Sequence, residues 1–345
     1  MDFLKDFNKE ISKMDGVATS SQPPRYWYSF GNYVLNSVMS GVFDEGLPQG
    51  RIIGLVGPSG SGKSFIAGNA VKSAQDAGAF VLVVDSEGAL DDDYMRKIGV
   101  DVENDYQYLD VKTISAAQSV ISSFLKGYKK EYGDSTEAPP VLIVLDSLGM
   151  LLTDTELENY DKQVMKGDQG QKSKQLKSLL RGLVQDIKRL NVTMIVTDHV
   201  YANQDLKNGE GLWIVNQAMR FALSQIVLVT KLKLKDKTKG TVNGIRMKCQ
   251  GFKTRFTKPF QEVTIEVPYD TGMDPCSGLV EAAVSQGVVT KKGSRYVIVG
   301  EEESWFAKDV EQRADKILAA LSGRKNELFI PDDMKIEEDE NQLED

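Results

Sequence analysis

Cysteine is nearly absent from this chain, which has two cysteines among 345 residues. Two thiols, at Cys249 and Cys276, are too few for a disulfide framework or for a zinc site with four ligands. The sequence also opens without the charged and then apolar leader that is typical of secreted proteins. These absences favour a reducing, cytoplasmic environment.

Long apolar runs are also missing. The apolar runs at residues 141–145 and 192–196 are far shorter than the roughly 18 residues that would indicate a membrane span. Hydrophobic residues make up 41% and charged residues 27% of the chain, which is ordinary for a globular protein. We therefore expect a soluble protein with a sizeable core and no membrane partner.

Positive charge is in deficit, with 42 basic against 50 acidic residues and a formal net charge of −8. Taken alone, this balance argues against a polyanion-binding protein. However, residues 331–345 hold eight acidic side chains and one lysine, and so contribute −7. The rest of the chain is nearly neutral, and its charge does not exclude nucleic acid.

Short apolar runs rich in β-branched residues alternate with helical patterns along the middle of the chain. This alternation predicts an α/β fold, with a largely parallel sheet and helices on both of its faces. Ligands of such sheets bind at the carboxyl ends of the strands. The expected strands are 51–56, 79–84, 141–145, 192–197 and 225–233, and the expected helices are 63–77, 114–130 and 171–190.

The flanking segments differ from this pattern. Residues 1–20 predict a short amphipathic helix, followed by a linker at 16–24. Residues 240–267 are typical of antiparallel strands, and 272–321 of a small α+β appendage. The expected division is an N-terminal packing segment (1–28), an α/β core (29–271), a small C-terminal domain (272–330) and a disordered acidic tail (331–345).

A glycine-rich segment connects the first core strand to a helix. It reads Gly57-Pro58-Ser59-Gly60-Ser61-Gly62-Lys63-Ser64 and fits the pattern of a phosphate-binding loop. In such loops backbone N–H groups surround phosphate oxygens, the lysine reaches the β and γ phosphates, and the final hydroxyl binds Mg²⁺. A flexible glycine-serine loop is the alternative, but the flanking strand and helix favour a site for ATP and Mg²⁺.

Two further strands end in acidic residues. The run 141–145 leads to Asp146, as in strands that hold Mg²⁺ through its water shell beside a phosphate-binding loop. The run 79–84 leads to Asp85-Ser86-Glu87, where Glu87 suits a base that polarises the attacking water. Either acid alone could cap a helix or a turn. Nucleotide kinases share the loop, but the arginine-rich lid for a second phosphorylated substrate is missing, so hydrolysis is favoured.

The segment 85–101 reads DSEGALDDDYMRKIGVD and closely resembles the segment after the second core strand of RecA-type recombinases. The phosphate-binding loop, Leu145-Asp146-Ser147-Leu148 and Lys253-Thr254-Arg255 extend this resemblance over residues 29–308. Phage recombinases of the UvsX type are most similar, which implies the cytoplasm of a host bacterium. The acidic tail is compatible with that group.

The resemblance implies roles at the nucleotide site. Glu87 would activate water, Asp91 would bind the adenine amine and Tyr94 would stack on the base. Lys253 and Arg255 would act on the γ-phosphate bound by a neighbouring subunit. Isolated monomers would then be poor ATPases.

His199, the single histidine, follows the strand 192–197. Bacterial RecA carries there a glutamine that senses the γ-phosphate, and a neutral imidazole can form the same kind of hydrogen bond. By itself, a lone histidine is more often structural. Asp198 stands where the family usually has asparagine, and its charge argues against a direct phosphate contact.

Two polar loops, 153–171 and 200–216, follow the strands that end near Asp146 and His199. In the family such loops line the axis of a filament and hold single-stranded DNA with little sequence preference. Disordered surface loops are the alternative. The second loop ends in Val215-Asn216, where the family has two glycines. The candidate DNA-binding residues are Lys162, Lys166, Lys174, Lys177, Arg181, Asn203, Lys207 and Trp213.

Residues 230–258 contain ten basic side chains and one acidic one, Asp236. The alternation of Lys231, Lys233 and Lys235 predicts a strand with one face in water. A solvated edge strand and a polyanion contact are equally compatible with it, so we assign no DNA contact there. Arg220-Phe221 resembles the lysine-phenylalanine pair at the family's subunit interface.

The combined expectation is a DNA-dependent ATPase that forms helical filaments on single-stranded DNA and exchanges strands with double-stranded DNA. Mediator and single-strand-binding proteins are implied partners. A ring motor such as a replicative helicase, or a coat protein that uses ATP only as a switch, are the alternatives. The acidic tail would compete with DNA for the basic surface.

Overall fold

The computed structural model describes residues 3–12, 14, 23–133, 135, 137–164, 170–202, 213–235 and 240–322. Its centre is an eight-stranded sheet with the strand order β12-β11-β10-β3-β7-β6-β4-β5. The parallel part consists of β10 (Gln225–Lys235), β3 (Ile52–Gly57), β7 (Val192–His199), β6 (Val141–Asp146), β4 (Phe80–Asp85) and β5 (Tyr106–Asp110). An antiparallel extension consists of β11 (Val242–Lys253) and β12 (Glu262–Pro268). The expected largely parallel sheet is confirmed.

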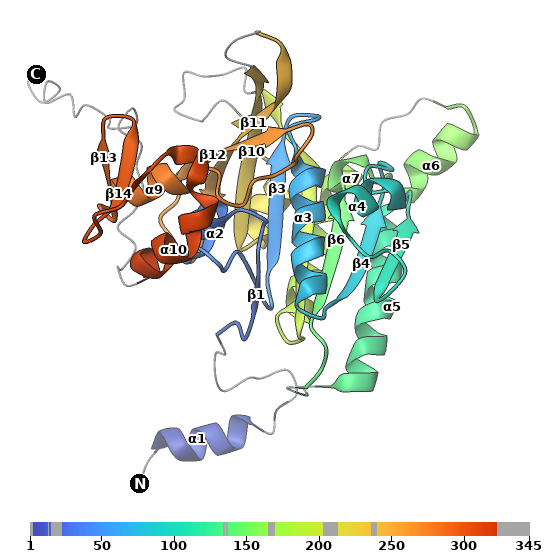
Figure 1. Cartoon of the computed structure of the whole chain (residues 1–345). Coiled ribbons are helices and arrows are strands. Elements are labelled where there is room, and N and C mark those ends of the chain that lie inside the picture. Colours follow the sequence, from blue (N-terminus) through green and yellow to red (C-terminus); the bar gives the residue numbers. More distant parts are fainter. Residues whose placement is uncertain are drawn as a thin grey trace, which may run out of the picture.

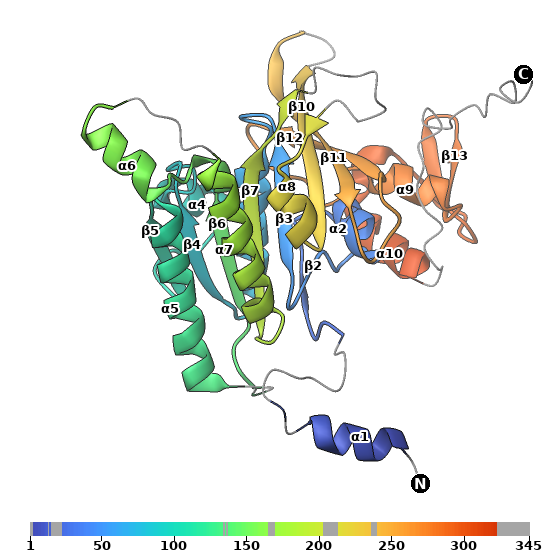
Figure 2. The same cartoon turned by 180° about the vertical axis from the view of Figure 1, so that it is seen from behind.

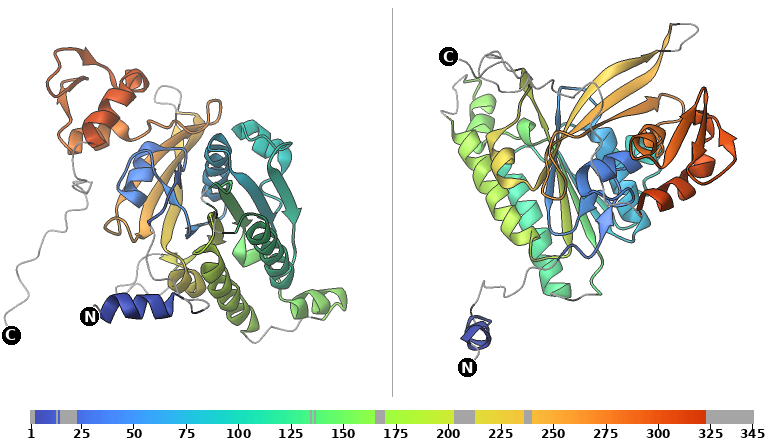
Figure 3. Two further views of the ribbon diagram at one scale, coloured as in Figure 1. Left: turned by 90° about the horizontal axis from the view of Figure 1, so that it is seen from below. Right: turned by 90° about the vertical axis from the view of Figure 1, so that its left-hand side faces the viewer.

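Helices cover both faces of this sheet. One face carries α2 (Tyr33–Ser40), α3 (Lys63–Asp76) and α4 (Asp92–Ile98), and the other carries α5 (Ile114–Tyr132), α7 (Gln171–Ile187) and α8 (Gln217–Ala222) (Figures 1 and 2). The right-hand view of Figure 3 looks along the sheet and separates the two layers. Both faces of the sheet need a helix layer because both are apolar. In strand β3, for example, Ile53 and Leu55 belong to one apolar cluster, whereas Ile52 and Val56 belong to the other.

Three elements that position the site depart from the sequence-based expectation. Strand β5 and helix α4 have no counterpart among the expected elements. The loop expected at 153–171 begins with a helix, α6 (Asp154–Asp161). A capping box forms its start: Thr153 accepts from the N–H of Glu156, and the Glu156 carboxylate accepts from the N–H of Thr153.

The two ends of the described chain also contain the expected elements. Helix α1 (Phe3–Ile11) is amphipathic and has no buried residue. Near the C-terminus, α9 (Leu279–Ser285), β13 (Val289–Lys292), β14 (Arg295–Ile298), β15 (Ser304–Trp305) and α10 (Ala314–Ser322) form an α+β unit with its own three-stranded sheet. The tail 331–345 lies outside the described residues. Among the helices that are described, none combines the length and the apolar character that a membrane span requires.

Candidate nucleotide and DNA site

The glycine-rich loop runs from the carboxyl end of β3 to the first turn of α3. Gly62 has φ +105°, a left-handed conformation that favours glycine. Gly57 is constrained by space, because a Cβ on it would lie 2.1 Å from the carbonyl oxygen of Val229 in β10. The neighbouring strand therefore fixes where the loop leaves the sheet.

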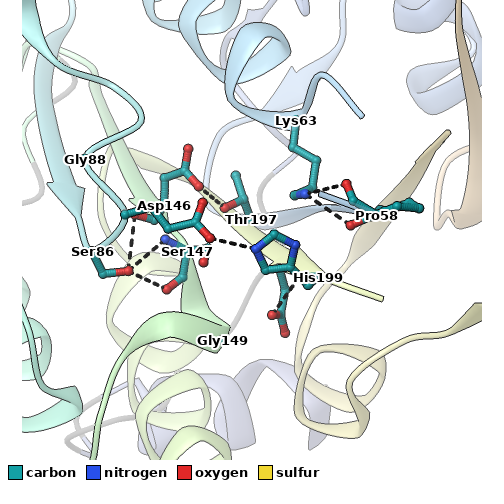
Figure 4. A network of polar contacts seen from close by, with 12 residues as sticks. Pro58, Lys63, Ser86, Gly88, Asp146, Ser147, Gly149, Thr197 and His199 are labelled. Atoms are coloured by element: carbon teal, nitrogen blue, oxygen red, sulfur yellow. Dashed lines mark hydrogen bonds and ion pairs between the residues drawn. The ribbon is translucent and has the colours of Figure 1, made fainter. Parts of the chain in front are cut away.

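Lys63 lies almost fully buried within the curve of this loop. Its Nζ donates to the carbonyl oxygens of Gly57 and Pro58, each at 3.1 Å (Figure 4). Burial lowers the pKa of the Lys63 ammonium, and the carboxylates of Asp146 and Glu87 act in the opposite direction. The loop thus encloses a cation whose present partners are carbonyl groups, the kind of acceptor that phosphate oxygens can replace.

Asp146 ends β6 and is fully buried. Its Oδ1 accepts from the hydroxyl of Thr197, and its Oδ2 has no hydrogen-bond partner. Burial raises the pKa of the Asp146 carboxyl, while the nearby hydroxyls of Thr197 and Ser64 lower it. An unpaired carboxylate oxygen beside the Ser64 hydroxyl fits an Mg²⁺ ion, which Ser64 would hold directly and Asp146 through water. The ion would neutralise charge on the nucleotide phosphates.

The loop after β4 is organised by Asp85, which the sequence did not single out as a functional residue. One carboxylate oxygen of Asp85 accepts from the N–H groups of Glu87 and Gly88 at 2.8 and 2.9 Å. The other accepts from the N–H of Leu90 at 2.9 Å and from the Tyr108 hydroxyl at 3.3 Å. The fully buried Asp85 carboxylate therefore sets the backbone that carries Glu87.

Glu87 and His199 form a direct pair. Nε2 of His199 lies 2.6 Å from Oε1 of Glu87, and the two side chains are 24% and 22% exposed. Glu87 belongs to the loop after β4 and His199 ends β7, and β6 separates these two strands in the sheet. Figure 4 shows His199, Asp146 and Lys63 around one space. The sequence predicted both residues of the pair in the site, but not that they bind each other.

A second link ties the Glu87 loop to the end of β6. The hydroxyl of Ser86 donates to the carbonyl of Ser147 at 2.8 Å and accepts from its N–H at 3.0 Å. The Asp146–Ser147 peptide bond, at the end of β6, is cis. The expected water-activating residue and the expected metal-binding strand thus form one hydrogen-bonded unit.

Asp198 connects the same site to the second polar loop. It is buried, with 3% of its surface exposed. Its Oδ1 accepts from the N–H of His199 at 2.8 Å, and its Oδ2 accepts from Nδ2 of Asn216 at 3.1 Å. A Cβ on Gly149, which lies between the end of β6 and the first loop, would lie 2.6 Å from Oδ1. The carboxylate therefore contacts the segment that leads from β6 to the first loop, and both ends of the second loop.

The expected adenine-binding residues lie at the start of α4. Asp91 caps this helix, since its side chain accepts from the N–H of Tyr94 at 2.9 Å. Tyr94 is half-buried, and burial raises the pKa of its hydroxyl to about 12. The helix cap thus holds the two expected adenine-binding residues together at the start of α4.

The expected trans-acting cations lie at the end of β11 and just beyond it. Nζ of Lys253 donates to the carbonyl of Arg220 in α8 at 2.6 Å. Burial lowers the pKa of Lys253, and the charges of Arg255 and Arg220 add to this effect. The ring of Phe221 is 78% exposed. The Arg220-Phe221 pair and both cations therefore share one region of the surface.

The expected DNA-binding residues divide between the loops and a helix. Lys162 ends α6 and pairs with Glu158 at 3.3 Å. In α7, Lys174, Lys177 and Arg181 are exposed on the side opposite its buried leucines. Lys166 lies outside the described residues.

The second loop is described only at its two ends. There β8 (Tyr201–Ala202) pairs antiparallel with β9 (Trp213–Ile214). Tyr201 is 73% exposed, whereas Trp213 is half-buried against the apolar cluster on the α5–α7 face of the sheet. Asn203 and Lys207 lie outside the described residues.

Comparison with known proteins gives a consistent family. The family model described as the RecA N-terminal domain matches residues 26–274. Protein RecA of Aquifex aeolicus is 29% identical over 262 residues, which cover 73% of this chain and 69% of that protein. Protein RecA of Thermus aquaticus is 28% identical over 258 residues, covering 72% and 69%.

The solved structures agree with this fold. The crystal structure of the RadB recombinase has a TM-score of 0.50 and 18% identity, and the match covers 71% of this chain and 98% of that one. The fold is therefore RecA-like, and the resemblance to RecA-type recombinases is confirmed at the level of the family. This chain belongs to the RecA family.

Proposed function

We propose that this protein is a DNA-dependent ATPase that polymerises on single-stranded DNA and catalyses homologous pairing and strand exchange. Membership of the RecA family supports recombination as the general activity. The motifs Asp85-Ser86-Glu87 and Asp146-Ser147-Leu148-Gly149, together with His199, support a phage recombinase of the UvsX type. Its cofactors are ATP and Mg²⁺.

One observation carries this proposal: Lys63, Asp146, Glu87 and His199 lie together at the ends of four neighbouring core strands. Lys63 follows β3, Asp146 ends β6, and the Glu87–His199 pair joins the loop after β4 to the end of β7. This arrangement supports a division of roles. Lys63 binds the phosphates, Glu87 polarises water, and His199 contacts the γ-phosphate.

The coupling to DNA follows from where the two loops begin. The first loop follows the segment that contains Gly149, the second begins just after His199, and Asp198 contacts both segments. A phosphate that engages His199 therefore acts on the backbone from which both loops leave. The loop side chains and the exposed cations of α7 hold the DNA backbone, and ATP binding orders them.

Assembly completes the site in this proposal. Residues 1–28 pack a subunit against its neighbour, residues 29–271 form the ATPase core, and 272–330 form a separate C-terminal domain. Lys253 and Arg255 act on the nucleotide of the adjacent subunit, with Arg220-Phe221 at the same interface. Their common surface region, with Phe221 largely exposed, supports this assignment.

The test measures ATP hydrolysis by the purified protein with and without single-stranded DNA, for the wild type and for Glu87→Gln. We expect strong stimulation of the wild type and loss of about 10²–10⁴ in rate for the variant, which keeps its shape but loses the base. A substitution of Asp85 cannot serve as the control, because the Asp85 carboxylate holds the backbone N–H of Glu87 in place. Glu281→Gln, in α9, is a matched exposed control.

Strand exchange between homologous oligonucleotides then separates the remaining activities. A recombinase exchanges strands, whereas a coat protein that uses ATP only as a switch binds without exchange. Electron microscopy of the DNA complex distinguishes helical filaments from the closed rings of a motor. Absence of DNA stimulation together with normal hydrolysis by Glu87→Gln would overturn the proposed mechanism.

A further inference from the structure

The ribbon formed by β10 and β11 contacts the phosphate-binding loop at three of its glycines. A Cβ on Gly57 would lie 2.1 Å from the carbonyl oxygen of Val229. A Cβ on Gly62 would lie 2.3 Å from Sδ of Met247. A Cβ on Gly60 would lie 2.8 Å from Nζ of Lys231. The ribbon is therefore a wall of the loop, and a lysine ammonium forms part of that wall.

The register of the sheet explains how Lys231 reaches this position. Strand β10 runs parallel to β3, with Leu228 opposite Val56, so its later residues extend beside the loop. Val227 and Val229 point into the apolar cluster on the α3 side of the sheet. Because side chains alternate along a strand, Lys231 lies on this same side. In the pairing with β11 its partner is Met247, the residue that contacts Gly62.

The charge of Lys231 is not neutralised within the described part of the chain. No described residue forms a hydrogen bond or an ion pair with it. It is close enough to act on another cation: burial is the main cause of the lowered pKa of Lys63, and the Lys231 ammonium adds to it. Two ammonium groups close to one phosphate-binding loop are mutually unfavourable unless an anion lies there.

We propose that Lys231 is a phosphate-binding residue that contacts the phosphate chain of ATP from the β10 side of the loop, in the same subunit. This inference rests on the proposed ATP site and adds a cation that its motif does not contain. His199, opposite Gly57 in β7, flanks the loop on one side, and Lys231 flanks it on the other. The nucleotide is thus held between the two strands that neighbour β3.

The geometry distinguishes Lys231 from the other lysines of the basic segment 230–258. Lys233 and Lys235 follow on the same strand, but neither ammonium is among the three atoms nearest to the Cβ position of any glycine of the loop. A solvated edge or a DNA contact predicts similar behaviour for all three. A phosphate contact predicts that Lys231 alone affects nucleotide affinity.

The experiment titrates the full-length protein with N-methylanthraniloyl ATP and ADP in Mg²⁺ buffer without DNA. We expect Lys231→Met to weaken ATP binding about tenfold and ADP binding less, because ATP carries the additional phosphate charge. Lys231→Arg keeps the charge and should stay within about threefold of the wild type. The matched control Lys233→Met should bind both nucleotides normally. Circular dichroism and the thermal midpoint establish that each variant is folded.

Two results would overturn the inference while leaving the proposed function standing. One is wild-type ATP affinity of Lys231→Met, including the case in which only its DNA affinity and salt dependence fall. The other is equal weakening by Lys233→Met, which would indicate a diffuse charge effect. If the wild type itself bound neither nucleotide, the proposed function would fail as well.

Discussion

Oδ2 of Asp198 accepts a hydrogen bond from Nδ2 of Asn216 at 3.1 Å. Asp198 belongs to the strand that ends at His199, and Asn216 is the N-cap of α8. The contact joins the expected γ-phosphate sensor to the helix that carries Arg220-Phe221. The carbonyl of Arg220 in turn accepts from Lys253. Hydrogen bonds thus link the nucleotide site to the expected subunit interface within one chain.

Asn216→Ala should destabilise the protein by about 2 kcal/mol. It removes the cap, in which Oδ1 accepts from the N–H of Ala218, and it leaves the buried Asp198 oxygen without its partner. Asn216→Ser keeps a capping acceptor, so its loss should be about half as large. Urea unfolding at neutral pH measures both. If both variants were as stable as the wild type, the hydrogen bonds of Asn216 would contribute nothing to the free energy of unfolding.

The buried carboxyl of Asp198 should make the free energy of unfolding depend on pH. Burial raises the pKa of its carboxyl above the ordinary value of 3.8, while its hydrogen bonds from His199 and Asn216 oppose this. Between these two pKa values the folded state holds a proton that the unfolded state has lost, so this group's contribution to stability falls as pH rises. In Asp198→Asn that contribution is absent.

The difference in unfolding free energy, wild type minus Asp198→Asn, should therefore be larger at pH 4 than at pH 7. Urea unfolding at a series of pH values checks the slope. The groups facing the carboxylate are the His199 backbone N–H, the Asn216 amide and, at longer range, the charges of His199 and Lys63. A pH-independent difference, or one that grows with pH, would contradict the raised pKa.

Gly57→Ala should destabilise the fold and disturb the loop. The added methyl group would meet the carbonyl oxygen of Val229 at 2.1 Å, a backbone atom that can move only if β10 shifts away from β3. We expect a loss of about 2–3 kcal/mol. Gly127→Ala is the control: Gly127 is an exposed residue inside α5 with nothing within 4 Å, and alanine there should stabilise by about 0.5–1 kcal/mol. Urea unfolding measures both variants: the free energy of unfolding should fall in Gly57→Ala and rise in Gly127→Ala.

The sequence predicted those elements of the structure whose residues form a recognisable apolar pattern. The strands at 51–56 and 141–145 were predicted within one residue, because both of their faces are buried and apolar. Strand β5 lies at the sheet edge and contains no fully buried residue, so it lacks such a run. Helix α6 was missed although Thr153 and Glu156 carry a capping-box signal in the sequence.

The site was predictable in its parts and not in its connections. Lys63, Glu87, Asp146 and His199 follow strand ends, and parallel strands bring such ends to one edge. The Glu87–His199 contact depends on the order β7-β6-β4, which the sequence does not state. The place of Lys231 beside Gly60 depends on the register of β10 against β3. Residues that act through backbone N–H groups, such as Asp85, give no pattern at all.

Phe221→Asp tests the expected subunit interface. Because 78% of this side chain is exposed, the change should alter the unfolding free energy of the monomer by less than about 0.5 kcal/mol. It should nevertheless abolish self-association and reduce the DNA-stimulated ATPase, since a charged group opposes burial between subunits. Sedimentation velocity measures the assembly. Val299→Asp, at a residue that is 57% exposed near the C-terminus, is the control and should assemble normally.

Deletion of residues 331–345 should strengthen binding to double-stranded DNA. The segment carries −7 of the net charge of −8, so its removal leaves a nearly neutral protein with exposed basic residues on α7. A tethered polyanion competes with DNA for such a surface, and salt screens both interactions. The increase in affinity for double-stranded DNA should therefore be severalfold at about 50 mM salt and small at about 200 mM. Fluorescence anisotropy with a labelled duplex measures it, and a variant with Asn and Gln in place of the eight acids separates charge from length. Unchanged affinity at low salt would exclude competition by the tail.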